Sequence, residues 1–439
     1  MSGHREAFLA RTPETPEVLA FASELSAREA GAAAAFDLSD GVSCAEAEVV
    51  ALVYNAELRL ARLRAGVTRA TADNAGLWED PSIGVDLTRI LESTPEPWKV
   101  FGTVGITIPI SGRLKIEREL AGVEHAAELA RVAAQEWSVR MRVRRAWSEW
   151  SGLEAELEAT QEFLARADAI LDVVDAMEGA GEMARTEARL FRIERATRAA
   201  ERASLEARVS EASLRLRGLM GMSPDAPFAF RSNGIGPGRS VPGARVGGTA
   251  RRTEFEASNP AMVVAAAEHD AAERLLELEI RKQYPDLHIG PGYGREDGQD
   301  QLLLGVSLPV PVLNGNRQGI AEAVARREVA RASAEATLEQ VISALRAAEV
   351  RLGAAEARRR VYEEEIVPLV DAQYADARRV ASLGEVNTIV ILESLTRQQD
   401  AKMGLIAAMR DEALASIDVE ELIGPESPDG SGKESGAHE

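Results

Sequence analysis

The strongest constraint on the fold is an internal duplication, because the chain presents one series of landmarks twice, about 200 residues apart. Each copy predicts the same order of elements: a helix, a strand, a turn, a second strand, a very long helix, a tight tip and another long helix. The recurring pairs are Asn55 and Asn259, Pro81 and Pro285, Pro109 and Pro309, Gly181 and Gly384, and Gly221 and Gly424. A near-constant period indicates a tandem repeat of one structural unit.

Composition favours long helices over a thick globular core. Charged residues make up 28% of the 439 residues and aromatic residues only 4%, and Ala, Glu, Arg and Leu dominate. The net charge of −20 argues against a surface that neutralises nucleic-acid phosphates. Its simplest interpretation is solubility. We therefore expect no nucleic-acid partner.

The sequence also offers no sign of a cofactor or metal site. Cys44 is the single cysteine, which excludes an internal disulfide and a cysteine cluster, and the apolar segment typical of a lipid-attachment signal does not precede it. The histidines include no ligand-spaced pair. No apolar run reaches the roughly 18 residues of a membrane-spanning helix, and the first residues lack the apolar core of a secretory signal.

Five regions follow from these patterns. They are an N-terminal extension (1–40), a first repeat (41–222), a Gly/Pro-rich linker (223–256), a second repeat (257–424) and a tail predicted to be disordered (425–439). Ser43 and Glu46 have the spacing of a capping box, which predicts a helix start at the opening of the first repeat.

Each repeat contains two segments of strict apolar–polar alternation, which predict four strands. We expect these strands at 82–91, 100–110, 286–296 and 302–312. In all of them one face is continuously apolar, whereas the opposite face carries Gly, Thr, Ser and other small or polar residues.

Each strand pair leads into an unusually long helix. The first is expected over about 112–177, roughly 100 Å of helix. The second is expected over about 317–383, interrupted only by Pro368. Apolar residues at three- and four-residue spacing predict a coiled-coil seam. Glycines at the tips, around Gly181 and Gly384, end one helix and let the next begin.

Four strands with apolar faces create a problem that one chain does not solve. Isolated hairpins of this kind are unstable and adhesive in water. A closed barrel in a membrane satisfies every backbone group, but such barrels use about eight strands or more. Three copies would supply about twelve strands. The expected fold is therefore mainly α with transmembrane β: a duplicated long-helix coiled-coil barrel with four strands per chain, in a trimer.

The order of elements and several motifs resemble those of the TolC-like outer membrane efflux proteins. The resemblance covers about residues 40–424. The motifs are Tyr54-Asn55-Ala56-Glu57-Leu58, Ile106-Thr107-Ile108-Pro109-Ile110-Ser111-Gly112-Arg113, Leu308-Pro309-Val310-Pro311-Val312-Leu313-Asn314-Gly315-Asn316-Arg317, and Leu383-Gly384-Glu385-Val386-Asn387-Thr388. The exit run of the second repeat is most similar to the branch that serves heavy-metal exporters.

This resemblance implies a passive homotrimeric conduit rather than an enzyme. A 12-stranded β-barrel would cross outer membrane lipid, and an α-helical tunnel would extend through the periplasm. A periplasmic adaptor (membrane fusion) protein and an inner-membrane efflux pump would be its partners. Pro109 and Pro309 would mark the change from barrel to helix, although ordinary strand-ending prolines would occupy the same places.

The resemblance also implies roles for the helix tips. Adaptor docking maps onto Gly181, Glu182, Gly384 and Glu385, whose glycines also serve simply to turn the chain. The acidic candidates for a closable aperture are Glu393, Asp172 and Asp175. On a coiled coil such carboxylates are commonly just solvated.

The sequence departs from the family at the aperture. The family closes it with a Tyr–Arg latch near the second tip, where this chain has Ala381 and Val386. We therefore expect different contacts to hold the aperture.

Two other readings compete with the channel. The first is a soluble or peripheral coiled-coil scaffold, which the missing secretory signal favours and the four apolar-faced strands oppose. The second is the adaptor of such a system, which would bring lipoyl-like and small β-barrel segments that this sequence does not display. No phosphate-binding Gly loop or nucleophile–His–acid set stands out, so an enzyme is the least favoured class.

Overall fold

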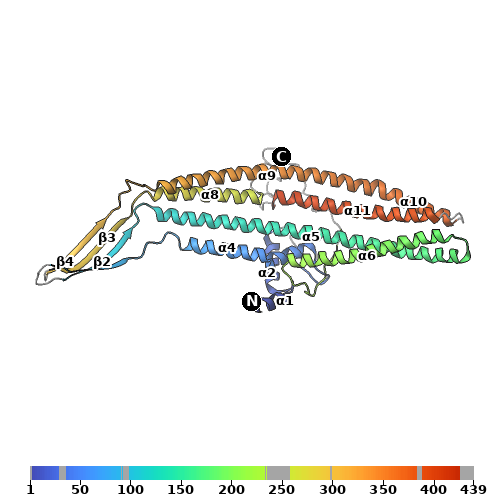
Figure 1. Ribbon diagram of the computed structural model, residues 1–439, viewed down its shortest axis with the longest axis horizontal. Coiled ribbons are helices and arrows are strands. Elements are labelled where there is room, and N and C mark those ends of the chain that lie inside the picture. Colours follow the sequence, from blue (N-terminus) through green and yellow to red (C-terminus); the bar gives the residue numbers. More distant parts are fainter. Residues whose placement is uncertain are drawn as a thin grey trace, which may run out of the picture. The chain divides into compact units, whose positions relative to one another are not determined.

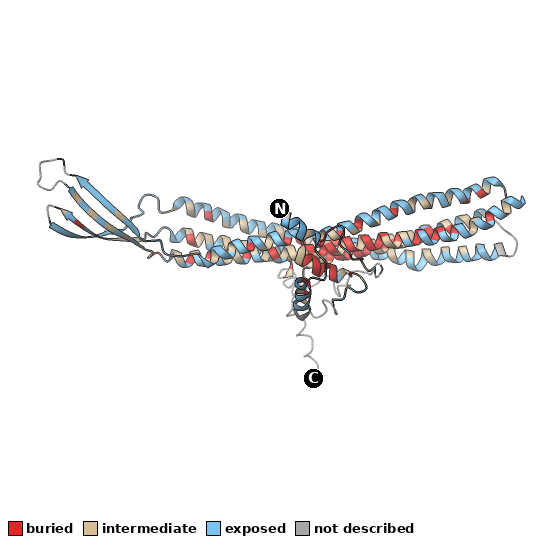
Figure 2. Ribbon diagram, turned by 90° about the horizontal axis from the view of Figure 1, so that it is seen from below, coloured by how far each residue is buried: buried red, intermediate tan, exposed pale blue. Residues whose placement is uncertain are grey.

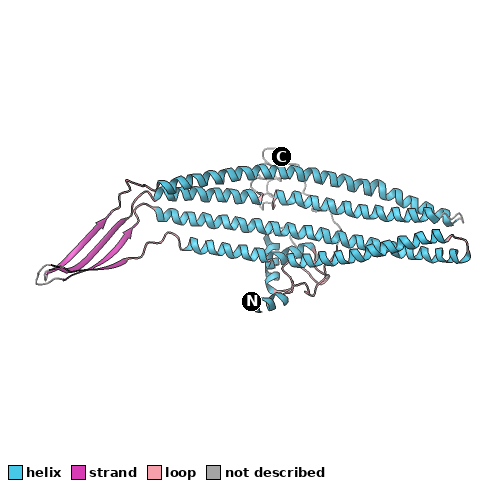
Figure 3. Cartoon of the chain, in the orientation of Figure 1, coloured by secondary structure: helices cyan, strands magenta, loops and turns pink. Residues whose placement is uncertain are grey.

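The computed structural model describes residues 2–28, 36–89, 91, 98–232, 234, 258–296, 299–382 and 388–425. The chain divides into two compact units, which are described separately below. The first comprises Met1–Arg59, Gln135–Asn259 and Gln340–Glu439, and the second comprises Leu60–Ala134 and Pro260–Glu339. Figure 1 labels the elements along the chain, and Figure 3 shows that they are mostly helices with one group of strands.

The described residues of the first unit form helices, loops and one isolated β-bridge. Its elements are α1 (Ser2–Leu9), α2 (Pro16–Arg28), α3 (Cys44–Tyr54), α6 (Arg185–Leu219), the π-helical turn η1 (Tyr362–Ile366), α10 (Val367–Ser382) and α11 (Thr388–Ile423). Parts of α4 (Ala56–Asp73), α5 (Arg113–Ala180) and α9 (Arg317–Val361) also belong to it. The bridge joins Val42 to Phe230, so the start of the first repeat lies beside the start of the linker.

The core of the first unit gathers around α3, α5 and α6. Trp147 and Trp150 meet edge to face at 5.2 Å between ring centres, and Phe230 packs against both. The capping box predicted from Ser43 and Glu46 is confirmed: the Ser43 hydroxyl accepts from the Glu46 backbone N–H, and the Glu46 carboxylate accepts from that of Ser43.

The N-terminal extension is more ordered than its composition suggests. Two of its residues, Val18 and Ala22 of α2, are buried in the core of the first unit. Arg11 donates to the backbone oxygen of Gly221 at 2.7 Å, and its guanidinium lies 5.0 Å from the ring centre of Tyr54. Because the segment is polar and rich in alanine, its sequence does not reveal these few buried residues and contacts.

A matching joint closes each repeat. The Asn55 side chain donates to the backbone oxygen of Leu219 at 2.8 Å, and that of Asn259 donates to the backbone oxygen of Leu422 at 2.5 Å. Asn55 also separates α3 from α4, whereas the order of elements predicted from the sequence has a single helix before the first strand. Gly221 follows the first joint at φ +70, with the Tyr54 carbonyl so close that only glycine fits.

The second unit contains the strands, and α8 (Pro260–Arg281) lies within it. The strands are β1 (Ser82–Arg89), β2 (Trp98–Ile108), β3 (Leu287–Glu296) and β4 (Gln299–Ser307). They form one antiparallel sheet in the order β1-β2-β3-β4. β2 and β3 come from different repeats, so the sheet joins the two copies. A satellite core of Ile116, Leu120 and Leu278 packs α5 against α8.

The structure places every strand close to its predicted range, but β4 begins and ends earlier than the alternation suggested. Its predicted end at 312 extends into the Pro-rich run 309–312, and proline cannot donate to a strand ladder. Among the described residues, no helix combines the length and apolarity needed to cross a membrane.

We expect Asn55→Ala to lower the free energy of unfolding by about 2 kcal/mol, because Asn55 is buried and makes several bonds. Its side-chain oxygen accepts from the backbone N–H groups of Glu57 and Leu58, in addition to the bond to Leu219. Urea unfolding followed by circular dichroism measures the loss. Asn74→Ala, which removes one exposed side-chain bond, is the control; an equal loss in both variants would contradict a special role for the joint.

Candidate functional site

The sheet presents two chemically different faces, and this contrast is the most informative feature of the molecule. One face carries the apolar side chains of all four strands: Ile83, Val85, Leu87, Val100, Val104, Ile106, Ile108, Leu287, Ile289, Tyr293, Leu302, Leu304 and Val306. Ile83 is 82% exposed and Leu302 is 85% exposed. Every residue of β4 and all but one of β1 are exposed, and Figure 2 shows the strands largely in the colour of exposed residues, with intermediate residues among them. A solvent-exposed apolar face of this extent is typical of a surface that contacts a membrane or another protein.

The opposite face is small and polar. Ser82 pairs with Gly105, Gly290 pairs with Gly305, and Thr103 pairs with both Gly84 and Gly292. Phe101 also lies on this face and packs against Gly294, where an added Cβ would overlap its ring. This face therefore alternates glycines with hydroxyl and other polar side chains, and Leu303 is a larger apolar residue on it.

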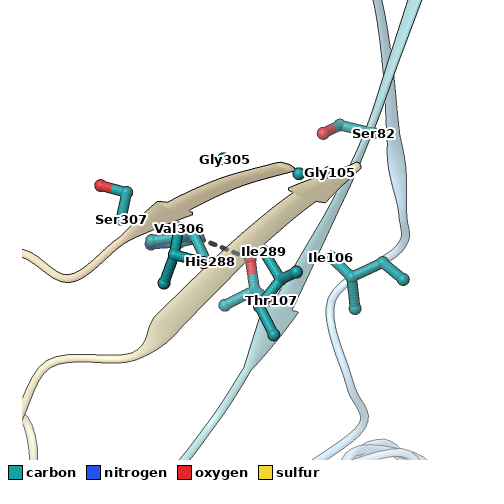
Figure 4. A pocket seen from close by; sticks show the side chains of 10 residues that line it. Ser82, Gly105, Ile106, Thr107, His288, Ile289, Gly305, Val306 and Ser307 are labelled. Carbon is teal, nitrogen blue, oxygen red and sulfur yellow. Dashed lines mark hydrogen bonds between the residues drawn. The ribbon is translucent and has the colours of Figure 1, made fainter. Parts of the chain in front are cut away.

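A shallow pocket of about 330 Å³ opens on this sheet. In Figure 4, Thr107 and His288 point toward one another from neighbouring strands, and their side chains share a hydrogen bond of 3.0 Å. Ser307 lies beyond His288 on the next strand, opposite it in the register. The hydroxyl groups and the imidazole that line this pocket can donate and accept hydrogen bonds. Within the described ranges, His, Cys, Asp and Glu residues do not form a group of three that could hold a metal ion.

Ionic contacts fix the connection between strands and helices in the first repeat. Pro109 directly follows β2, and Arg113 begins α5 four residues later. The Arg113 guanidinium contacts Asp286 at 3.1 Å, Glu79 at 3.0 Å and Glu117 at 3.2 Å. Partial burial works against the charge, but these carboxylates raise the pKa of Arg113. One side chain thus ties together the segments before β1, after β2 and before β3.

The second repeat uses a different device at the same place. Pro309 lies two residues beyond β4, and Asn316 adopts φ +52 just before α9. The Asn316 side chain donates to the backbone oxygen of Glu279 at 2.8 Å and to its carboxylate at 2.7 Å. Burial raises the pKa of Glu279, but Lys282 and Asn316 outweigh it and lower that pKa overall. Both prolines thus lie just beyond strand ends.

The first helix tip is a compact turn. Gly181 follows α5 at φ +80, and the N–H of Glu182 donates to the Met177 oxygen at 2.9 Å. Met183 is buried beneath the turn with Val174 and Phe191. Gly181 and Glu182 are exposed at its apex. The counterparts Gly384 and Glu385 lie outside the described residues, as does Val386; Ala381 lies in α10.

The three acidic aperture candidates differ in their surroundings. Asp175 is bound by Arg192 at 2.6 Å, and that arginine also contacts Glu178 at 2.5 Å. Arg192 donates hydrogen bonds to these two carboxylates, which raise its pKa. Glu393 pairs with Arg397, one turn along α11, at 2.6 Å. Asp172 is exposed on α5. The structure does not bring the three carboxylates into one cluster within this chain.

Arginines that sequence reasoning passed over connect the helices of the first unit. Arg144 of α5 contacts Glu48 of α3 at 2.5 Å and also Glu420 of α11. Burial lowers its pKa, but both carboxylates more than compensate and raise it. Cys44 lies nearby, and burial, followed by the charge of Glu48, raises the pKa of its thiol. The sequence offers one signal for these contacts: several arginines in the run Arg142-Val143-Arg144-Arg145, on a helix with apolar periodicity.

Comparisons with known proteins agree with this geometry. Residues 49–222 match the model of the outer membrane efflux protein family. The cobalt-zinc-cadmium resistance protein CzcC of Cupriavidus metallidurans is 22% identical over 248 residues. That alignment covers 56% of this chain and 58% of CzcC, so it spans little more than half of that protein's length.

Solved structures share the fold. A membrane protein from Pseudomonas aeruginosa superposes with a TM-score of 0.73 at 16% identity, over 90% of this chain and 98% of that one. The outer membrane protein VceC from Vibrio cholerae gives 0.68 at 17% identity, over 87% and 96%. The fold is therefore that of the TolC-like channels. Residues 49–222, which include most of the first repeat, thus match the outer membrane efflux proteins that the motifs of this chain resemble.

We expect Arg113→Ala to accelerate amide hydrogen exchange at 284–288 by roughly tenfold, because three carboxylates lose their common partner. Mass spectrometry of the exchanged protein measures the rate. Arg317→Ala is the matched control, because Arg317 opens α9 as Arg113 opens α5 but is exposed. Equal exchange in wild type and Arg113→Ala would show that the arginine does not secure the junction.

Proposed function

We propose that this protein is the outer membrane channel component of a tripartite efflux or export system. Three copies would form a passive conduit, with a 12-stranded β-barrel in the outer membrane and an α-helical tunnel in the periplasm. The match of residues 49–222 to the outer membrane efflux protein family supports a conduit that performs no chemistry of its own. The observation that carries the proposal is the sheet with one exposed apolar face.

The sheet also supports a trimer. Among the described residues, β1 and β4 are its outer strands, and the far side of each has no strand beside it. Open edges do not persist in lipid, because their backbone N–H and C=O groups would be unsatisfied. Pairing β1 of one copy with β4 of the next removes every edge. Twelve strands are enough for closure, whereas four are not.

The two faces then acquire separate roles. The apolar face would contact outer membrane lipid, and the small, polar face would line the lumen. Phe101 would pack against Gly294 in the wall of that lumen. Pro109 and Pro309 would mark the change from barrel to tunnel, with Arg113 and Asn316 holding the chain at the two crossings.

The helical end would meet the partners. A periplasmic adaptor would dock on the tips, at Gly181 and Glu182 in the first repeat and at Gly384 and Glu385 in the second. The first of these is supported by the exposed apex above a buried Met183. An inner-membrane pump would supply direction. A coiled-coil scaffold explains the helices equally well, but it leaves the exposed apolar face of the sheet without a purpose.

The decisive experiment expresses the protein with a supplied signal sequence and extracts it from outer-membrane fractions. We expect a detergent-solubilised trimer by native mass spectrometry, and discrete conductance steps after insertion into planar bilayers. The trimer is expected because it closes the sheet at its edges. A monomer or dimer that is absent from membranes would contradict the proposed channel and favour the coiled-coil scaffold.

Among the aperture candidates, Asp172 is best placed to act on permeating ions. Arg192 already neutralises Asp175, and Arg397 pairs with Glu393. An exposed carboxylate without such a partner attracts cations more strongly than one in an ion pair. We therefore place the charge that tunes the tunnel mouth at Asp172, with Glu393 second.

We expect Asp172→Asn to lower the preference for cations over anions, with a smaller effect from Glu393→Gln. Asp175→Asn is the control and should change the preference least, because its charge is balanced by Arg192. Reversal potentials in asymmetric KCl and ZnCl2 measure this; zinc is included because one relative is named for cobalt, zinc and cadmium resistance. Identical reversal potentials for wild type and Asp172→Asn would show that Asp172 does not determine the ion preference.

A further inference from the structure

The polar face of the sheet carries an unbalanced charge. This face consists of every second residue in 82–88 of β1, 99–107 of β2, 288–296 of β3 and 299–307 of β4. Its acidic residues are Asp86 and Glu296, its basic residue is Lys99, and its imidazole is that of His288. The other side chains on this face of the four strands are uncharged.

Lys99 and Glu296 balance one another. The Lys99 ammonium contacts the Glu296 carboxylate on the neighbouring strand, and both side chains are partly buried. Two opposite charges in contact present little net field to an ion several ångströms away, because their attraction and repulsion nearly cancel. Asp86 is therefore left as the net charge of the polar face.

Asp86 is open to solvent, and other side chains do not shield it. It lies opposite Phe101 in the register, but the Phe101 ring packs against Gly294 on β3, on the far side of β2 from Asp86. Arg89, the arginine next along β1, lies on the apolar face with its guanidinium carbon 5.4 Å from the centre of the Trp98 ring. Among the described residues, Asp86 is exposed and forms no ion pair.

An exposed carboxylate on the wall of a water-filled passage raises the local concentration of cations and lowers that of anions. Charged side chains around a passage select ions in this way. In the trimer proposed above, the polar face lines the lumen, and symmetry places one Asp86 from each copy at the same level.

We propose that Asp86 makes the lumen of the barrel selective for positively charged solutes, while the Lys99–Glu296 pair keeps the remaining charges of the wall in balance. This selectivity rests on the function proposed above, for which it names cations as the favoured class of substrate. The negative field around Asp86 is a property of the single chain and does not depend on that function. Asp86 lies in the second unit, whereas the aperture candidates Asp172 and Glu393 lie in the first.

Charged thiol reagents measure this field directly in the detergent-solubilised, full-length protein at pH 8. In a Cys44→Ser background, Thr88→Cys places a thiol on the polar face two residues from Asp86, roughly 7 Å along the strand. The measured quantity is the rate of reaction with a cationic methanethiosulfonate divided by the rate with an anionic one. We expect Asp86→Asn to lower this ratio by roughly threefold at 10 mM salt.

Ser307→Cys provides the matched control for position. Ser307 lies on the same face, but at the level of Thr107, about 20 Å along the strands from the level of Asp86. At 150 mM salt the screening length is about 8 Å, so the rate ratio at this thiol should not respond to Asp86→Asn. An unchanged ratio at Thr88→Cys, or an equal fall at both thiols, would overturn the local field.

Permeability ratios in planar bilayers test the selectivity, with variants that act in opposite directions. In dilute KCl, Asp86→Asn should roughly halve the permeability of cations relative to anions. Glu296→Gln leaves the Lys99 charge unbalanced and should also lower it, whereas Lys99→Gln should raise it. The double variant Lys99→Gln with Glu296→Gln keeps the balance of the wild type and should match it.

Salt supplies a further criterion. At 1 M KCl the screening length falls to about 3 Å, so the differences among the variants should vanish. Shifts in one direction for Lys99→Gln and Glu296→Gln alike, or shifts that persist at 1 M KCl, would point to altered pore shape and overturn the proposal.

The two experiments separate the charge from the conduit. A wild-type protein that does not conduct contradicts the proposed channel, and the thiol rates still decide whether Asp86 sets the field on its face. Thiol rates that respond to Asp86→Asn, together with unaltered permeability ratios, would reject the selectivity while the channel stands.

Discussion

The sheet of this protein leaves an apolar face exposed within one chain, and much of the rest of the architecture is organised around that constraint. Its apolar face is exposed from Ile83 on β1 to Leu302 on β4. Its outer strands come one from each repeat, and the central pairing of β2 with β3 joins the copies. A duplicated chain thus delivers a four-stranded module with matching ends, which is the form that a circular assembly requires.

Arginine provides much of the cohesion in the helical unit, because long two-helix contacts offer only narrow apolar seams. Arg144 and Arg145 hold α5 to the end of α11, and Arg359 continues the contact to α9. The guanidinium group suits this task because its rigid fork binds carboxylates on two sides and remains charged when partly buried. Some of the many acidic residues of the chain thus serve as partners for these arginines.

Much of the fold was predictable because it repeats short-range rules. Alternation located the strands, the Ser43–Glu46 spacing located the start of α3, and the glycine at 181 located a turn. The misses have physical causes. Asn55 breaks a helix through a bond to Leu219, which is distant in sequence. The anchoring of Val18 depends on a core that its own segment does not contain.

The candidate site was less accessible from sequence than the fold. Prolines 109 and 309 could be placed, but the residues that hold the junctions, Arg113 and Asn316, act through partners in other segments. Likewise, the three acidic candidates looked equivalent until ion pairing distinguished Asp175 and Glu393 from Asp172. Charge is visible in a sequence, whereas neutralisation by a neighbour requires the folded chain.

The joint at Asn55 has a consequence for the origin of the chain. Its partner Leu219 lies in the same repeat, and Asn259 and Leu422 stand in the same relation within the other. When the ancestral segment was copied, donor and acceptor were therefore inherited together, and neither copy needed a compensating change at this position. A half-length ancestor would already have contained this complete hydrogen bond. Six such subunits could therefore have assembled the ring that three chains of two repeats each would form now.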